Sequence, residues 1–404
     1  MIADMDDTGS RSRRVLVAYV IGAFGLAISA QITFLVPLRA RELGAGFDVI
    51  GLIVGSGALA AAAMSVPSGA IIDRLGPKWS FVFGTGATAV VSLGFVMVTN
   101  YWWFLALQPL HGVARNLAWV ASQGYITSFA SDAERPRLTG RFSFFGNVGQ
   151  MAGPLLVGGA AGLVGFQFAL LVPATYSLMF ALLGLALRET RAAEHGATRE
   201  RQGVGLGAAV RLLGLRGIQV ALLFTFARLW TGAVYNTFFP VYLVDRGVSP
   251  SLAGTVMAVS GLVAAAMAPT TGYWTRFVSQ QTATTVGLGC SALALVLAPQ
   301  VATVPWVFVV PALIGIGSGL SLPLLISIVT TAAPDGSRGV ALGLRGMVNQ
   351  TAATAAPVLI GPLMGALGLL LGFTTGGLLA GVLLAGARWL HTTDTAQPSR
   401  PRDG

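Results

Sequence analysis

Charged residues are scarce in this 404-residue chain. Asp, Glu, Lys and Arg together make up 10% of it, whereas hydrophobic residues make up 54% and the mean hydropathy is +0.74. A soluble domain carries roughly a quarter charged residues. A surface built from this composition cannot face mostly water, so we expect an integral membrane protein.

Cysteine and lysine are almost absent. The single cysteine, Cys290, excludes an intrachain disulfide, and its apolar surroundings favour a packed small hydrophobe. The chain has 24 arginines and one lysine. This ratio, together with the many Ala and Gly residues, favours a GC-rich bacterial source. We therefore expect a multi-pass protein of the bacterial inner membrane. The first apolar run, from residue 15 to about 38, is long enough to span a bilayer and too long for a signal-peptide core.

Motifs of catalysis and of cofactor binding are also missing. The sequence has no HExxH, no Cys/His cluster with metal spacing, no paired carboxylates and no phosphate loop after a strand. The run GIGSG at 315–319 lies in an apolar segment and indicates close helix packing. The net charge of +10 comes from short basic clusters between apolar runs, a pattern of membrane topology and not of nucleic-acid binding. We expect no enzyme activity, no cofactor, no metal site and no nucleic-acid partner.

Long apolar runs follow one another along the chain and predict an all-α protein with twelve transmembrane helices. The predicted spans are 15–38, 48–70, 77–98, 102–130, 138–163, 165–187, 217–243, 250–273, 281–299, 304–331, 341–366 and 369–390. We predict an N-terminal six-helix bundle at 1–187, a cytoplasmic linker at 188–216, a C-terminal bundle at 217–390 and a disordered tail at 391–404. The end of the linker, LGAAVRLLGLRG, is typical of an amphipathic surface helix.

Basic residues predict the orientation. With both termini in the cytoplasm, 20 Lys and Arg residues lie on the inner side, including Arg345 near the start of its span, and three lie outside. Two arginines belong to neither side, Arg115 and Arg228.

The two halves repeat at a constant offset of 203 residues. Seven pairs of identical residues share it: Pro37 and Pro240, Gly51 and Gly254, Gly69 and Gly272, Gly112 and Gly315, Arg135 and Arg338, Gly140 and Gly343, Pro154 and Pro357. Most lie at predicted turns or helix ends. The pattern predicts a duplicated six-helix unit with parallel halves, a transporter plan in which the site lies at the membrane midplane.

The segment GAIIDRLGPKW resembles the loop signature between helices 2 and 3 of the major facilitator superfamily, and the resemblance extends over nearly the whole chain. Its matching residues are Gly69, Asp73, Arg74, Gly76 and Lys78. The resemblance implies a fold of two pseudo-symmetric bundles, in which these residues clamp the halves together and tune the conformational switch. Asp73 can also cap the positive end of a helix; the alternative is a solvated loop charge. The counterpart in the second half has Arg276 where Asp73 stands.

Two further signatures of that family are matched in part. GRFSFFGNVGQMAGPLLVGG, from Gly140, resembles the helix 5 signature of drug–proton antiporters, and through it Gly153 and Pro154 join the predicted switch. Ordinary small-residue packing explains the same glycines. In helix 4 the usual membrane arginine falls at Gln108, and Arg115, seven residues later on the same helix face, resembles a displaced version of that charge.

The predicted spans carry no Asp or Glu near mid-depth, so Arg115 and Arg228 have no intramembrane counter-ion. An arginine at mid-membrane costs roughly 2.5–3.5 kcal/mol, and such residues normally face a wet cavity or a partner. We predict that the two guanidinium groups hold one anion from opposite halves. A structural role, bonding carbonyls freed at broken helices, is the alternative. The predicted substrate-binding set is Arg115, Arg228, His111, Gln108, Trp119, Tyr235, Gln31, Asn147 and Asn349, and Trp230 and Phe239 are further aromatics nearby.

His111 is the one ordinary titratable group near the membrane centre, and an unperturbed imidazole, with a pKa of about 6.5, suits proton exchange. A hydrogen-bonded packing residue is the alternative. We predict a monomeric secondary active transporter that exports a small organic, anionic or amphipathic molecule by alternating access, with protons as the candidate coupling ion. The alternatives are an organic-anion importer, exchanger or facilitator, and a non-transporting receptor or lipid transporter on the same scaffold.

Overall fold

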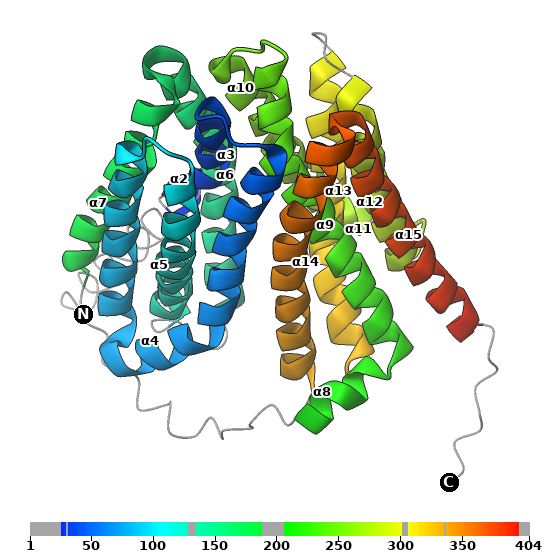
Figure 1. Ribbon diagram of the computed structural model, residues 1–404. Coiled ribbons are helices and arrows are strands. Elements are labelled where there is room, and N and C mark those ends of the chain that lie inside the picture. The colour runs from blue at the N-terminus through cyan, green and yellow to red at the C-terminus, as the bar shows by residue number, and fades with distance from the viewer. Residues whose placement is uncertain are drawn as a thin grey trace. The chain divides into compact units, whose positions relative to one another are not determined.

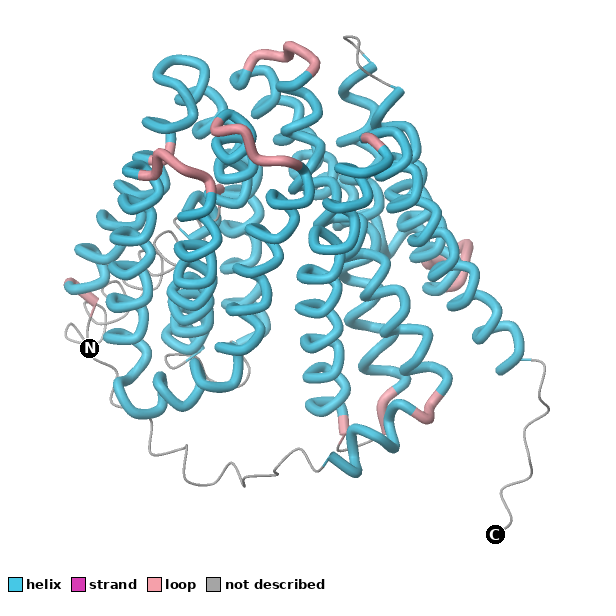
Figure 2. The backbone as a smooth tube through the Cα atoms, viewed as in Figure 1, coloured by secondary structure: helices cyan, strands magenta, loops and turns pink. Residues whose placement is uncertain are grey.

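The computed structural model describes residues 26–29, 31–127, 135–187, 206–300, 306–334 and 337–395. Within these ranges the chain is helical, joined by short loops and without a strand (Figures 1 and 2). The α-helices of the first half are α2 (Leu26–Ser29), α3 (Ile32–Glu42), α4 (Phe47–Met97), α5 (Trp102–Thr127), α6 (Arg135–Ala169) and α7 (Leu171–Leu185). Those that follow are α8 (Leu206–Leu213), α9 (Arg216–Asp245), α10 (Pro250–Met267), α11 (Thr271–Trp274), α12 (Gln280–Leu297), α13 (Val309–Ala332), α14 (Arg338–Leu367) and α15 (Leu369–Thr395). Short 3-10 turns occupy Ala268–Thr270, Ala298–Gln300 and Trp306–Phe308.

The prediction of an all-helical membrane protein is confirmed. Nine helical segments within the described ranges are long and apolar enough to cross a bilayer. Three of the predicted spans are not among them. The apolar run of α5 is interrupted by polar residues, and α7 has only 15 residues. Of the first predicted span, residues 15–25 lie outside the described part. Large apolar side chains cover the outside: Leu163 is 87% exposed and Met97 79%. A surface of this kind is suited to lipid and not to water. The number of twelve spans stays a prediction.

Packing divides the described chain into two compact units. The first comprises described residues of Met1–Glu200 and Asn236–Gly261, and the second those of Arg201–Tyr235 and Leu262–Gly404. In the first unit α4 packs against α5 and α7, and in the second α12 packs against α13 and α15 (Figure 1). The division passes through α9. The predicted division into two bundles at the linker 188–216 stays a prediction, and residues 188–205 lie outside the described part. The eight-residue helix α8 forms where the sequence predicts an amphipathic segment.

Glycine backbones explain why α10 up to Gly261 belongs to the first unit. Gly158 on α6 faces Gly254 on α10 so closely that a Cβ atom on Gly158 would lie 2.7 Å from the Gly254 Cα. About two turns further on, a Cβ on Gly261 would lie 3.3 Å from the Cβ of Met151. Residues without side chains let helix backbones approach in this way, which is a common mode of helix packing in membranes.

The internal repeat extends to backbone geometry. The described chain has five glycines with positive φ, and four of them form two pairs at the offset of 203 residues: Gly44 (92°) with Gly247 (83°), and Gly165 (80°) with Gly368 (86°). Other residues rarely adopt this conformation. The prolines Pro154 and Pro357, which share the same offset, both lie inside helices. Turns and proline positions therefore recur in both halves.

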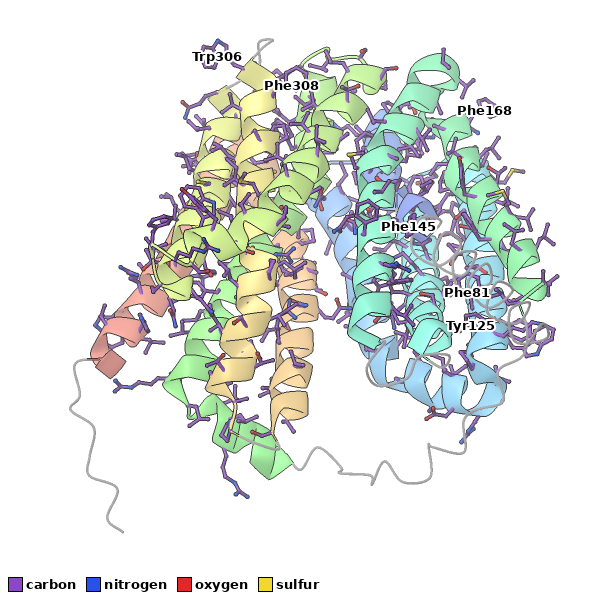
Figure 3. All side chains as sticks on the ribbon, turned by 180° about the vertical axis from the view of Figure 1, so that it is seen from behind. Phe81, Tyr125, Phe145, Phe168, Trp306 and Phe308 are labelled. Atoms are coloured by element: carbon purple, nitrogen blue, oxygen red, sulfur yellow. The ribbon has the colours of Figure 1, made fainter. Side chains whose placement is uncertain are left out.

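Aromatic side chains mark the ends of helices. Trp306 and Phe308 lie together at one end of α13, and Phe168 lies at the opposite end of the first unit from Tyr125 and Phe81 (Figure 3). Trp306 is 63% exposed. Exposed tryptophan at helix ends is typical of the interface between lipid and water.

Candidate functional site: buried polar groups on α5, α9 and α14

The polar face of α5 is covered by α4. Gly112 on α5 packs against the carbonyl oxygen of Gly57 on α4, so closely that a Cβ atom would collide with it. This contact brings Gln108 against Gly57, where a Cβ would lie 2.9 Å from the Gln108 Cγ. As a result Gln108 and His111 are each only 2% exposed. The sequence prediction that these two residues share a face with Arg115 follows from spacings of three and four residues.

His111 and Gln108 each keep an unused polar atom. The Nε2 of His111 and the Oε1 of Gln108 are buried and have no hydrogen-bond partner in the described part of the chain. The His111 ring lies edge-on to Phe95, with ring centroids 6.0 Å apart. Arg115, one turn further along α5, is half-buried and lies within electrostatic range of His111. A buried polar atom without a partner costs about 1–3 kcal/mol, so these groups are candidates for binding water, a proton or a ligand.

Other residues predicted near this face have structural contacts. The ring of Trp119 packs 5.3 Å from that of Phe142 on α6. The side chain of Gln31 is buried against Gly153 on α6, and its Nε2 donates to the Ala27 carbonyl oxygen at 3.1 Å. Asn147, in contrast, is exposed on α6. Gln31 and Trp119 therefore join helices, whatever else they do.

Arg228 is the buried cation of the second unit. It is half-buried on α9, and its Nε has no partner within the described ranges. The hydroxyl of Thr231, one turn later, donates to the carbonyl oxygens of Ala227 and Arg228, both at 3.0 Å. Tyr235 is fully buried. Because α5 lies in the first unit and this part of α9 in the second, the prediction that Arg115 and Arg228 hold one anion stays a prediction.

Sequence reasoning missed the neighbour of Arg228 on α14. Arg345, counted among the cytoplasmic basic residues, is the eighth residue of a 30-residue helix and is half-buried. It lies within electrostatic range of Arg228, and its Nε likewise lacks a partner in the described chain. Asn349, one turn further on, is half-buried with an unpartnered Oδ1. A basic residue early in a span is expected from membrane topology alone. The sequence therefore contains no signal that distinguishes a binding role for Arg345 from a topological one.

The predicted switch residues lie on two kinked helices. Gly69, Asp73, Arg74 and Lys78 belong to α4, which is interrupted at Gly76 by a non-helical conformation with φ 79° and ψ 158°. Asp73 and Arg74 are exposed and make no ion pair with a described residue, and the Lys78 ammonium lies 5.2 Å from the Trp79 ring.

On α6, Pro154 lies inside the helix one residue after Gly153, and its carbonyl oxygen contacts Gly254. The switching role of these residues stays a prediction.

A pocket of about 190 Å³ opens in the second unit at the ends of four helices. Its polar lining residues are Arg216, Gln280, Gln281, Thr331 and His391. None of the residues predicted for substrate binding lines it. Within the described ranges, no group of three or more His, Cys, Asp or Glu residues could hold a metal ion.

Comparison with known proteins identifies related chains. The family model described as Major Facilitator Superfamily matches residues 15–357 and, again, 221–403. The staphylopine export protein of Staphylococcus aureus is 26% identical over 37% of this chain, which spans 38% of that protein's length. An uncharacterized MFS-type transporter of Methanocaldococcus jannaschii is 20% identical over 83% of this chain and 87% of that protein.

Solved structures share the fold at low sequence identity. The nucleoside transporter NupG superposes with a TM-score of 0.78 at 15% identity, over 94% of this chain and 99% of NupG. A bacterial homolog of the human lysosomal transporter Spinster, in an inward-facing and unoccupied conformation, superposes with a TM-score of 0.75 at 16% identity, over 95% and 96% of the two chains.

Proposed function

Because this chain belongs to the Major Facilitator Superfamily, we propose that it is a secondary active transporter that exports a small organic anion by alternating access across the bacterial inner membrane. The observation that carries the anionic substrate is the pair of arginines within helices, Arg115 and Arg228, whose guanidinium groups form no hydrogen bond or ion pair with a described residue. A guanidinium in hydrocarbon needs water or an anion. Its planar fork binds carboxylate, phosphate or sulfonate through two parallel hydrogen bonds.

Export is the direction that one curated relative and one sequence segment favour. One curated relative is named as an export protein, and the helix 5 segment containing Gly153 and Pro154 resembles an exporter signature. An importer, exchanger or facilitator of organic anions is the second candidate, because the arginines favour an anion whichever way it moves. Counterflow in proteoliposomes of known orientation separates the two.

The test of this function begins with a thermal-shift screen of organic anions against organic cations, followed by flux of the stabilising compounds into proteoliposomes. We expect anions to stabilise the protein and to be transported. Arg115→Ala and Arg228→Ala should each reduce anion flux about 10-fold or more, because each removes a charge-assisted hydrogen bond to the substrate. Arg388→Ala, which removes an exposed arginine bonded to Thr282, is the matched control. Undiminished flux in both test variants would contradict the anionic substrate.

Proton exchange is the coupling that we propose, and His111 is its carrier. The support is a buried Nε2 without a partner beside Arg115, in spans that lack carboxylates. In His111→Gln, transport driven by a pH gradient should fall to the rate of passive exchange, while counterflow without a gradient continues. Wild-type transport that ignores a pH gradient would remove His111 from this role.

A further inference from the structure

Arg228 and Arg345 place two positive charges within electrostatic range of each other in one unit. The helices that carry them pack together: Phe224 and Ala227 of α9 lie in one apolar cluster with Ala341 of α14, against which Leu344 also packs. Arg228 follows Ala227 and Arg345 follows Leu344 in sequence, and the two guanidinium groups lie within electrostatic range of each other. Like charges at close range in a low-dielectric setting repel strongly. Something of negative charge is needed to hold them there.

The protein supplies no carboxylate for this purpose from the same unit. Residues 201–235, 262–334 and 336–393 contain no Asp or Glu at all. The acidic residues of this unit are Asp335 in the α13–α14 connection, Asp394 in the last turn of α15 and Asp403 in the tail. Neither guanidinium group makes a hydrogen bond or ion pair with a described residue. The described residues therefore leave the counter-charge to a ligand.

A neutral polar residue lies one helical turn from each arginine. Asn349 lies one turn after Arg345 on the same face of α14, and its Oδ1 is buried without a partner in the described chain. Thr225 lies one turn before Arg228 on α9, is fully buried, and has an equally unpartnered Oγ1. An amide and a hydroxyl both donate and accept hydrogen bonds. Both arginines keep part of their surface exposed.

We propose that Arg228 and Arg345, with Asn349 and Thr225 beside them, form an oxyanion-binding site within the second unit. The ligand is a small molecule with a carboxylate, phosphate or sulfonate group, which accepts hydrogen bonds from both guanidinium forks. This inference rests on the proposed function and deepens it, because it assigns the anionic group of the substrate to two arginines of one unit. A phospholipid headgroup offers the same chemistry, and the experiment distinguishes it from a free solute.

The test measures binding of sodium sulfate by thermal shift, with sodium chloride at equal ionic strength as the reference. We expect sulfate to raise the Tm of the wild type. Arg228→Gln and Arg345→Gln should each weaken the apparent Kd about 10- to 100-fold, and the double variant should lose the response. Arg276→Gln, which removes an exposed arginine of the same unit, should respond as the wild type does. An unchanged sulfate affinity in Arg345→Gln would overturn the proposal.

A second readout separates a binding pair from a structural one. In anion-free buffer, Arg345→Gln should raise the Tm of the protein, since it relieves the repulsion from Arg228. An arginine that holds the helices together would instead lower the Tm when replaced, and that result would also overturn the proposal. Arg345→Lys keeps the charge and should leave the anion-free Tm near that of the wild type, which guards against a general folding defect.

Two further outcomes separate the site from the transport function. If phosphatidylglycerol in nanodiscs competes with sulfate and phosphatidylcholine does not, the arginine pair binds a lipid phosphate, and the assignment to the substrate is wrong. If sulfate binds through both arginines but no organic anion is transported, the site stands and the proposed function fails. If organic-anion flux is observed with the same KM in wild type and Arg345→Gln, the function stands and the site is wrong.

Discussion

Trp230 illustrates how a side chain can serve the packing of helices where its position in the sequence favours ligand contact. It lies on α9 two residues after Arg228, in a region where aromatic rings suit a ring-bearing substrate. In the structure it is 3% exposed, and its Nε1–H donates to the carbonyl oxygen of Gly376 on α15 at 3.0 Å. The indole therefore ties two helices of the second unit together.

Replacement of this tryptophan should affect stability and leave the substrate affinity unchanged. Trp230→Phe removes the hydrogen bond to Gly376 and leaves a small void, with an expected loss of about 1–3 kcal/mol. Thermal unfolding in detergent measures the loss, and the KM for flux should stay within about twofold. Trp306→Phe, at a position 63% exposed, is the control and should leave the Tm unchanged. A raised KM without a lower Tm would indicate contact between Trp230 and the substrate.

The candidate site could be predicted only in part, for a reason that Arg228 and Arg345 make clear. Arg228 stands in the middle of an apolar run. Because a charged side chain in hydrocarbon has a high free energy, the sequence alone identifies Arg228 as a candidate functional residue. Arg345 stands eight residues into its helix, where an arginine also satisfies the bias of basic residues towards the cytoplasm. Its position next to Arg228 depends on how α9 and α14 pack, and hydropathy contains no information on which faces of two helices meet.

At the scale of elements, small residues decide which helices pack closely. The contact between α6 and α10 depends on Gly158 and Gly254, whereas a Cβ on the adjacent Gly159 would meet nothing within 4 Å. The sequence shows the paired glycines Gly158 and Gly159 without telling which of them faces a neighbour. Hydropathy predicted that these helices exist, and only the packing distinguishes their faces.

This difference between neighbours allows a matched test. Gly158→Ala should destabilise the protein by about 1–3 kcal/mol, because its methyl group would press on the Gly254 backbone. Gly159→Ala should be neutral or slightly stabilising, since alanine favours helix over glycine by up to about 1 kcal/mol. Thermal unfolding of both variants in one detergent makes the comparison. Equal Tm values would show that α6 and α10 are not in tight contact in solution.

At the scale of the molecule, the first unit joins residues from both predicted halves. Arg41, at the end of α3, forms an ion pair with Asp245, at the end of α9, with its Nη2 3.0 Å from the carboxylate. Next to it the rings of Phe47 and Phe238 lie 6.4 Å apart. The ion pair is partly exposed and is worth at most about 1 kcal/mol. Contacts of this strength hold one conformation without preventing its exchange with another.

If transport requires α6 and α10 to separate, a covalent link between them should stop it. Met151 and Gly261 face each other at a Cβ distance of about 3.3 Å, which is near the range of a disulfide. In a Cys290→Ser background, Met151→Cys with Gly261→Cys should abolish flux under oxidising conditions, and a reductant should restore it. Each single cysteine variant, treated with the same oxidant, should transport normally. Full flux in the crosslinked protein would show that this contact is static.

The constant offset between Pro37 and Pro240 persists through the positive-φ pairs as far as Gly165 and Gly368. The turns at these glycines therefore keep the same spacing in both halves. Between these landmarks the two predicted copies differ by substitution, with no net gain or loss of a residue. Such conservation of length suggests that turn geometry is constrained more tightly than the side chains that the turns connect.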